Sequence, residues 1–159
     1  MPQPFTFMTQ YFWVLCLAFG AINYVRVRRA LPAEHGSEVR GYLNKFAIGV
    51  NLPWLVMGVG HLTGYTPNVW YYFRPQDGNP FVIAWLATVF AASYCYAWWV
   101  LFAGGAEKVR DLNLSLMLGH YSGKRQPLWT IKLFAVIGVA MFPVWVYVAM
   151  SMDAPLPKF

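Results

Sequence analysis

The sequence predicts an all-α integral membrane protein with four transmembrane helices in an up-down-up-down antiparallel bundle. Of its 159 residues, 58% are hydrophobic and 11% are charged, whereas soluble domains average about 45–50% and about 25%. The hydrophobic residues gather into four stretches, each close to the roughly 20 residues that cross a bilayer. Aromatic residues make up 19% of the chain, which suits a protein with two membrane–water interfaces.

The first apolar stretch covers residues 7–25 and ends at a group of arginines. No lysine or arginine precedes it, and no small-residue cleavage pattern follows it. A secretory signal has a basic start and a small-residue cleavage site, and this stretch has neither. We therefore expect a retained helix whose N-terminal end lies outside the cytoplasm.

The second apolar stretch covers residues 46–62. Its helix can begin earlier, because Ser37 is a suitable N-cap residue. Pro53 lies in its interior and removes the hydrogen bond to the Gly49 carbonyl, which predicts a kink. Asn51 lies close by, and we expect its side chain to satisfy this carbonyl rather than to bind a substrate.

The third apolar stretch, residues 81–103, has the clearest boundaries. Asn79 and Pro80 supply an N-cap and a proline at the first helical position. Gly104 and Gly105 follow the last apolar turn and predict a break there.

The fourth apolar stretch covers residues 128–150. Pro127 precedes it, and Pro143 in its interior predicts a second kink. The four helices are expected to form a single membrane domain over residues 1–159. Its connecting segments are 26–45, 63–80 and 104–127.

The basic residues predict the orientation of these helices. Ten of the 12 lysines and arginines lie in or beside segments 26–45 and 104–127, and the opposite side has only Arg74 and Lys158. Basic residues favour the cytoplasm, so both termini are expected outside it and these two segments inside. A multi-pass protein of a bacterial inner membrane is the simplest location. The basic residues form no long run with interleaved aromatics, so we expect lipid and protein partners rather than nucleic acid.

The connecting segments contain residues suited to lipid or partner contacts. Val109, Leu112 and Leu116 recur at helical spacing and predict a short amphipathic helix. Aromatic residues also gather in the outer segment and at the end of the third helix. The expected contact residues are Trp70, Tyr71, Tyr72, Phe73, Leu112, Leu116, Trp98 and Trp99.

The four apolar stretches contain no Asp, Glu or Arg. Ion-coupled transporters and intramembrane proteases generally use such residues inside the helix bundle. The sequence also has no phosphate-binding glycine loop and no cysteine–histidine spacing of a metal site. We therefore expect neither catalytic residues nor a metal site, and the chain does not read as an enzyme.

His61 and Met57 are the candidate cofactor-binding residues. They lie on one face near the outer end of the second helix. Neutral imidazole and thioether groups ligate haem iron. The structural alternative is a histidine that bonds to a neighbouring backbone carbonyl, and the sequence favours no particular cofactor.

Three functions stay open at this point. The first is an accessory or scaffolding subunit of a larger membrane protein complex, with respiratory and photosynthetic assemblies as candidate hosts. It is favoured because the chain lacks catalytic residues and has aromatic-rich helices. The second is a cofactor-binding subunit that holds haem, a quinone or a pigment. The third is a small oligomeric transporter or channel, with Pro53 and Pro143 as hinges.

Overall fold

The computed structural model describes residues 4–30, 36–111 and 125–151. Over these residues the chain forms α-helices and short 3₁₀ helices and contains no strand, which confirms the all-α class. The helices are α1 (Pro4–Gln10), α2 (Phe12–Ala30), α3 (Gly36–Leu62), η2 (Val69–Phe73), η3 (Pro75–Asp77), α4 (Pro80–Phe102), α5 (Gly105–Asp111) and α6 (Leu128–Ser151).

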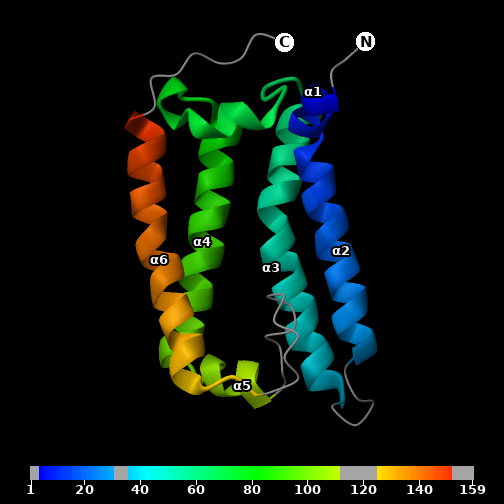
Figure 1. Ribbon diagram of the computed structural model, residues 1–159, viewed down its shortest axis with the longest axis vertical. Coiled ribbons are helices and arrows are strands. Elements are labelled where there is room, and N and C mark those ends of the chain that lie inside the picture. Colours follow the sequence, from blue (N-terminus) through cyan, green and yellow to red (C-terminus); the bar gives the residue numbers. More distant parts are fainter. Residues whose placement is uncertain (1–3, 31–35, 112–124, 152–159) are drawn as a thin grey trace.

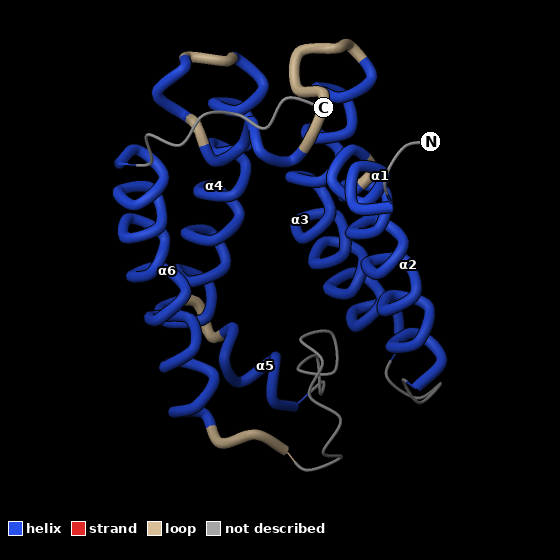
Figure 2. Tube along the Cα trace, turned by 45° about the horizontal axis from the view of Figure 1, so that its top comes forward, coloured by secondary structure: helices blue, strands red, loops and turns tan. Residues whose placement is uncertain are grey.

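The four long helices stand in an open row in the order α2, α3, α4 and α6, each antiparallel to its neighbours (Figure 1). Extensive contacts join α2 to α3, α3 to α4, and α4 to α6. Between the described residues of α2 and α6 there is no comparable contact, and these two are the outermost helices of the row (Figure 2). The antiparallel order matches the expected one, but the row does not close into a bundle.

Two helices, α4 and α6, are long and apolar enough to cross a membrane, with 23 and 24 residues. In the most apolar 18-residue stretch of each helix, only 11% of the residues are buried. The core helix of a soluble protein is mostly buried. Their exposed side chains include Ile83, Phe90, Ile137 and Val144. The other two long helices are more polar, because α2 ends in arginines and α3 begins with charged residues.

The bounds of α4 and α6 lie within one residue of the expected 81–103 and 128–150. The side chain of Asn79 caps α4, because its oxygen accepts from the Phe81 backbone N–H at 3.0 Å. The starts of α4 and α6 follow from local signals, because a cap residue or a proline precedes each long apolar run.

Helix α3 begins at Gly36, well before the apolar stretch that starts at residue 46 and within two residues of the earlier start that a Ser37 cap predicts. Ser37 therefore lies within the first turn and is not the N-cap. The polar first three turns extend the helix beyond its apolar part, so hydrophobicity alone misplaces the start.

The first expected helix, 7–25, is divided into α1 and α2 by a bend at Tyr11. The Tyr11 backbone N–H still donates to the Phe7 carbonyl at 3.0 Å, so hydrogen bonding continues through the bend. Helix α2 then extends to Ala30, because its arginines are good helix formers.

Helix α3 continues through Pro53. The Asn51 side chain donates to the Ala47 carbonyl at 2.7 Å, and not to the Gly49 carbonyl that the proline leaves without a donor. The expected role of Asn51 is thus not the one observed. Its side chain lies against Gly20 of α2, where only a residue without a side chain leaves enough room.

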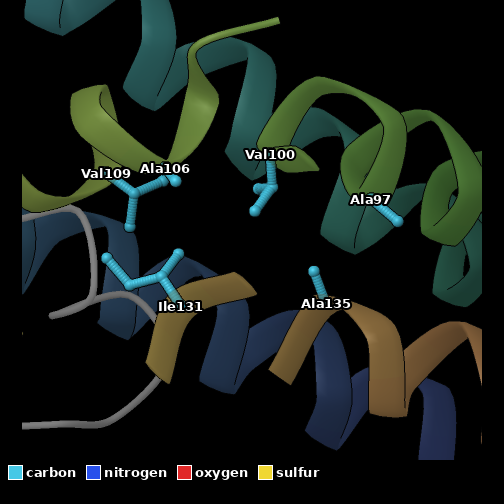
Figure 3. Close-up of a cluster of buried hydrophobic side chains, with 6 residues drawn as sticks. All are labelled: Ala97, Val100, Ala106, Val109, Ile131 and Ala135. Carbon is cyan, nitrogen blue, oxygen red and sulfur yellow. The ribbon is translucent and has the colours of Figure 1, made fainter. Parts of the chain in front are cut away.

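One hydrophobic cluster joins α4, α5 and α6 (Figure 3). It lies at the end of the long helices opposite to α1 (Figure 1). Val109 of α5 is 2% exposed and packs there, so the short helix is held by protein contacts. Leu112 and Leu116, the other apolar residues of the expected amphipathic helix, lie outside the described residues. The cluster consists of Ala97, Val100, Ala106, Val109, Ile131 and Ala135.

The contact between α2 and α3 depends on a glycine beneath an indole ring. A Cβ atom on Gly58 would lie 2.7 Å from Cε3 of Trp13. We expect Gly58→Ala to lower the free energy of unfolding by about 1–3 kcal/mol, because the ring must move. The measurement is denaturant unfolding of the purified full chain in detergent, followed by circular dichroism.

Gly49→Ala in the same helix is the matched control for Gly58→Ala. No atom lies within 4 Å of a Cβ at Gly49. This change should leave stability unaltered or raise it by up to about 1 kcal/mol through helix propensity. If both variants were as stable as the parent chain, the proposed packing would be wrong.

Candidate functional site

The segment between α3 and α4 lies across one end of the row (Figure 1) and contacts α1, α4 and α6 through η2 and η3. Local hydrogen bonds shape it. Asn68 Oδ1 accepts from the Trp70 backbone N–H at 3.0 Å, and Asn79 Nδ2 donates to the Tyr65 carbonyl at 2.7 Å. Gly64 supplies a left-handed turn with φ of 79°. These contacts give the segment a defined position over the helix ends.

Tyr72 is the buried centre of this segment, with 1% of its surface exposed. Its hydroxyl donates to the Met57 carbonyl at 3.4 Å and lies 2.9 Å from Thr66 Oγ1. Since the phenol has one proton, the Thr66 hydroxyl donates to the Tyr72 oxygen. A Cβ on Gly60 would lie 2.5 Å from Thr66 Oγ1, so glycine makes this approach possible. Burial raises the pKa of Tyr72, and the bond with Thr66 partly offsets that rise.

The aromatic residues expected at lipid or partner surfaces occupy different environments. Tyr72 does not lie at a surface as expected, because the structure buries its side chain where the hydroxyl has protein partners. Trp98 is 63% exposed, as a surface contact requires. Trp99 instead stacks on Tyr42 with ring centroids 5.8 Å apart. The remaining members of this set are half-buried: Trp70, Tyr71 and Phe73.

His61 is held in one orientation by the backbone. Its Nδ1 lies 3.0 Å from the Pro67 carbonyl oxygen. Because a carbonyl oxygen only accepts, Nδ1 carries the proton, and Nε2 of the neutral ring keeps its lone pair. The rings of Tyr11 and Trp13 lie 5.2 and 6.2 Å from the imidazole ring. Metal-binding histidines are oriented in the same way, by a bond from the nitrogen that does not ligate.

Met57 and His61 have different immediate neighbours. Met57 is 3% exposed and packs with Tyr72 and Val82. Trp13 packs against this cluster and also against the imidazole ring, so its indole links the two candidates. The Trp13 Nε1–H group is buried and has no acceptor among the residues that the structure describes. Over those same residues, no group of three or more His, Cys, Asp and Glu side chains could hold a metal ion.

The opposite end of the row carries the polar contacts of α5. The Lys108 ammonium lies 4.6 Å from the centre of the Tyr42 ring, a cation–π contact. Arg110 Nε lies 2.9 Å from Asp111 Oδ1. This hydrogen bond lowers the pKa of the Asp111 carboxyl and raises the pKa of Arg110. Both groups are exposed, so the pair orients side chains and adds little stability.

Comparisons of the chain with protein-family models, with curated proteins and with solved structures found no match. Function is therefore inferred from the residues of this chain and their geometry.

Tyr72→Phe removes the hydroxyl that Thr66 and the Met57 carbonyl share. We expect a loss of about 1–3 kcal/mol in the free energy of unfolding, because buried polar groups lose their partners. Tyr65→Phe is the matched control, since Tyr65 is 56% exposed. Unfolding in detergent by circular dichroism measures both variants, and equal stability would contradict the buried hydrogen bonds.

The stabilities of Tyr72→Phe and Tyr65→Phe should depend differently on pH at high pH. The raised pKa of Tyr72 means that its neutral form is preferred in the folded chain. This stabilisation is present below pH of about 10 and is lost as pH rises through the raised pKa. The Tyr72→Phe variant should lack this part of the alkaline loss of stability, whereas Tyr65→Phe should retain it.

Proposed function

We propose that the chain crosses a membrane four times, with α2, α3, α4 and α6 as the spans. Helix α2 is the shortest, and its 19 residues correspond to about 28 Å at about 1.5 Å per residue. The hydrocarbon core of a bilayer is roughly 30 Å thick. Exposed apolar residues on the two more polar helices support their membrane position. They include Phe19 and Ile22 on α2 and Ile48 and Leu55 on α3.

We place the α5 end of the row in the cytoplasm and the α1 end outside, in a bacterial inner membrane. The ends of α2 and α6 nearest α5, the start of α3 and α5 itself carry most of the basic residues. At the other end, over the described residues, the only lysine or arginine is Arg74, which pairs with Asp77 at 3.1 Å. Basic residues favour the cytoplasmic side, which supports this orientation.

Within that membrane, the function best supported is an accessory or scaffolding subunit of a larger complex, with respiratory and photosynthetic assemblies as the favoured hosts. The observation that carries this proposal is the open row, which leaves a broad apolar face on α6. Gly138 lies in this face between exposed Phe134 and Met141, and no atom lies within 4 Å of a Cβ built there. A gap of this kind lets the helix of a partner subunit approach closely.

The test is a native gel of the tagged chain, extracted from its native membranes in mild detergent, with mass-spectrometric identification of the bands. We expect the chain to migrate in an assembly much larger than its monomer. Gly138→Leu should release it from that assembly, because the added side chain fills the gap while leaving the monomer's own contacts intact. Gly138→Ala is the matched control and should keep the assembly. Migration of the parent chain alone would contradict the proposal.

A second function, cofactor binding, is favoured by one observation at His61. The bond from Nδ1 to Pro67 leaves the lone pair on Nε2 of the neutral ring. The Trp13 ring, whose buried N–H has no acceptor among the described residues, lies 6.2 Å from the imidazole ring between centroids. Together these groups supply one acceptor or ligand atom and one donor, as a haem or quinone site would need. Met57 contributes packing beneath the Trp13 ring.

On this second proposal, the native protein carries a visible or near-ultraviolet absorption band from the bound group. His61→Ala should abolish the band, because the orienting nitrogen ligand is lost. His120→Ala removes a histidine elsewhere in the chain and should leave the band unchanged. Identical spectra of the His61 variant and the parent chain would exclude His61 as a ligand.

A further inference from the structure

Most of the basic residues lie at the α5 end of the row and form two groups. One belongs to α5 and the start of α6, and the other to the end of α2 and the start of α3 (Figure 1). The two groups differ in whether their charges have partners in the protein.

Three of the charges near α5 have neighbours in the protein that match them. Arg110 bonds to the adjacent carboxylate. The Lys132 ammonium lies 4.0 Å from a carboxylate oxygen of Glu107, and the Lys108 ammonium lies over a tyrosine ring. An external anion would have to compete with these contacts.

Arg26 of α2 bonds to Asn23 at 2.6 Å, but the other lysines and arginines on α2 and α3 have no such partner among the described side chains. Arg28, Arg29, Arg40 and Lys45 form no ion pair or hydrogen bond with any side chain that the structure describes. Residues 26–45 contain five basic and two acidic residues. This part of the chain therefore keeps a net positive charge even when both carboxylates are counted against it.

A hydrogen bond places two of these arginines at the same end of the helix pair. The Tyr24 hydroxyl donates to Asn44 Oδ1 at 2.7 Å and joins α2 to α3. Arg28 lies one turn beyond Tyr24, and Arg40 lies one turn before Asn44. Like charges on neighbouring helices repel, and an anion relieves that repulsion. Guanidinium groups match phosphate well, because they donate two parallel hydrogen bonds.

Apolar side chains adjoin this basic end. Ile22 and Val25 of α2 are 61% and 44% exposed, and Ile48 of α3 is 66% exposed. Val25 and Arg28 lie three residues apart on α2, and Arg40 and Ile48 lie eight residues apart on α3, so each arginine shares a helix face with an exposed apolar side chain. A matching ligand has a phosphate for the arginines and an apolar chain for these side chains. A phospholipid has both, whereas nucleic acid or free phosphate would use the arginines alone.

We propose that the α2–α3 end binds the head group of an anionic phospholipid. Its phosphate lies between Arg28 and Arg40, and an acyl chain follows Val25 and Ile48 along the helix pair. The site rests on the proposed membrane position of α2 and α3. It is independent of the complex that the chain joins and of any cofactor at His61.

The test uses the purified full chain in a neutral detergent. It is titrated with phosphatidylglycerol and with phosphatidylcholine of the same acyl chains, and bound lipid is counted by native mass spectrometry. We expect phosphatidylglycerol to bind about tenfold more tightly. The double variant Arg28→Gln, Arg40→Gln should weaken that binding by about 25-fold, about fivefold for each arginine. Lysine at both positions should restore part of the affinity, because it keeps the charge but not the planar fork.

The charge-matched control is the double variant Arg110→Gln, Arg125→Gln, which should change phosphatidylglycerol affinity by less than about twofold. Equal weakening by the two double variants would overturn the site, because it would show only a diffuse basic surface. Equal affinity for the two lipids would also overturn it. So would displacement of phosphatidylglycerol by millimolar inorganic phosphate, which would show an anion site with no need for a lipid chain.

An alkaline wash of the native membranes separates this proposal from the membrane position on which it rests. A chain that crosses the bilayer stays in the washed membranes. Release of the parent chain would overturn the membrane position and the lipid site with it. Retention of the parent chain and of both variants, combined with equal lipid affinities, would overturn the lipid site alone.

Discussion

The buried hydroxyl of Tyr72 makes the hydrogen bonds on which the α1 end of the molecule depends. It bonds to α3 and to Thr66, and the Tyr72 ring packs against Met57 of α3 and Val82 of α4, which holds the connecting segment against both helices. Gly60 is required beneath it, because any side chain there would meet these hydroxyls. Pro67 follows Thr66 directly, and its carbonyl orients His61. The imidazole therefore takes its direction from the same packing that holds the segment in place.

The four long helices are held together by short segments at both ends of the helices and by aromatic rings between neighbouring helices. The connecting segment contacts α1, α4 and α6 at one end, and α5 joins α4 to α6 at the other. Between them, Trp85 and Trp145 meet edge to face with ring centroids 5.5 Å apart, and Phe90 meets Phe142 at 5.7 Å. Such pairs add specificity beyond the area that they bury. Over the described residues, no comparable contact joins the first and last helices of the row, α2 and α6.

The two ends of the row also differ in charge and in how that charge is used. At the α1 end, Arg74 is paired with Asp77. At the α5 end, short-range contacts match the charges on α5, whereas Arg28, Arg29, Arg40 and Lys45 form no ion pair with any side chain that the structure describes. The same type of residue thus has protein partners on α5 and none among the described side chains at four positions of α2 and α3.

The sequence by itself determined the helical class, the two apolar helices α4 and α6, and the Asn79 cap, because apolar length and capping chemistry lie within a few neighbouring residues. It also singled out His61 as the one histidine in an apolar stretch. Only the tertiary structure decided that Tyr72 is buried, that Asn51 bonds to the Ala47 carbonyl, and that Trp13 lies beside His61. Each of these depends on which helix faces which, and a hydrophobic pattern on one helix does not specify its neighbour. For the same reason the sequence could not show that the four long helices form an open row and not a closed bundle.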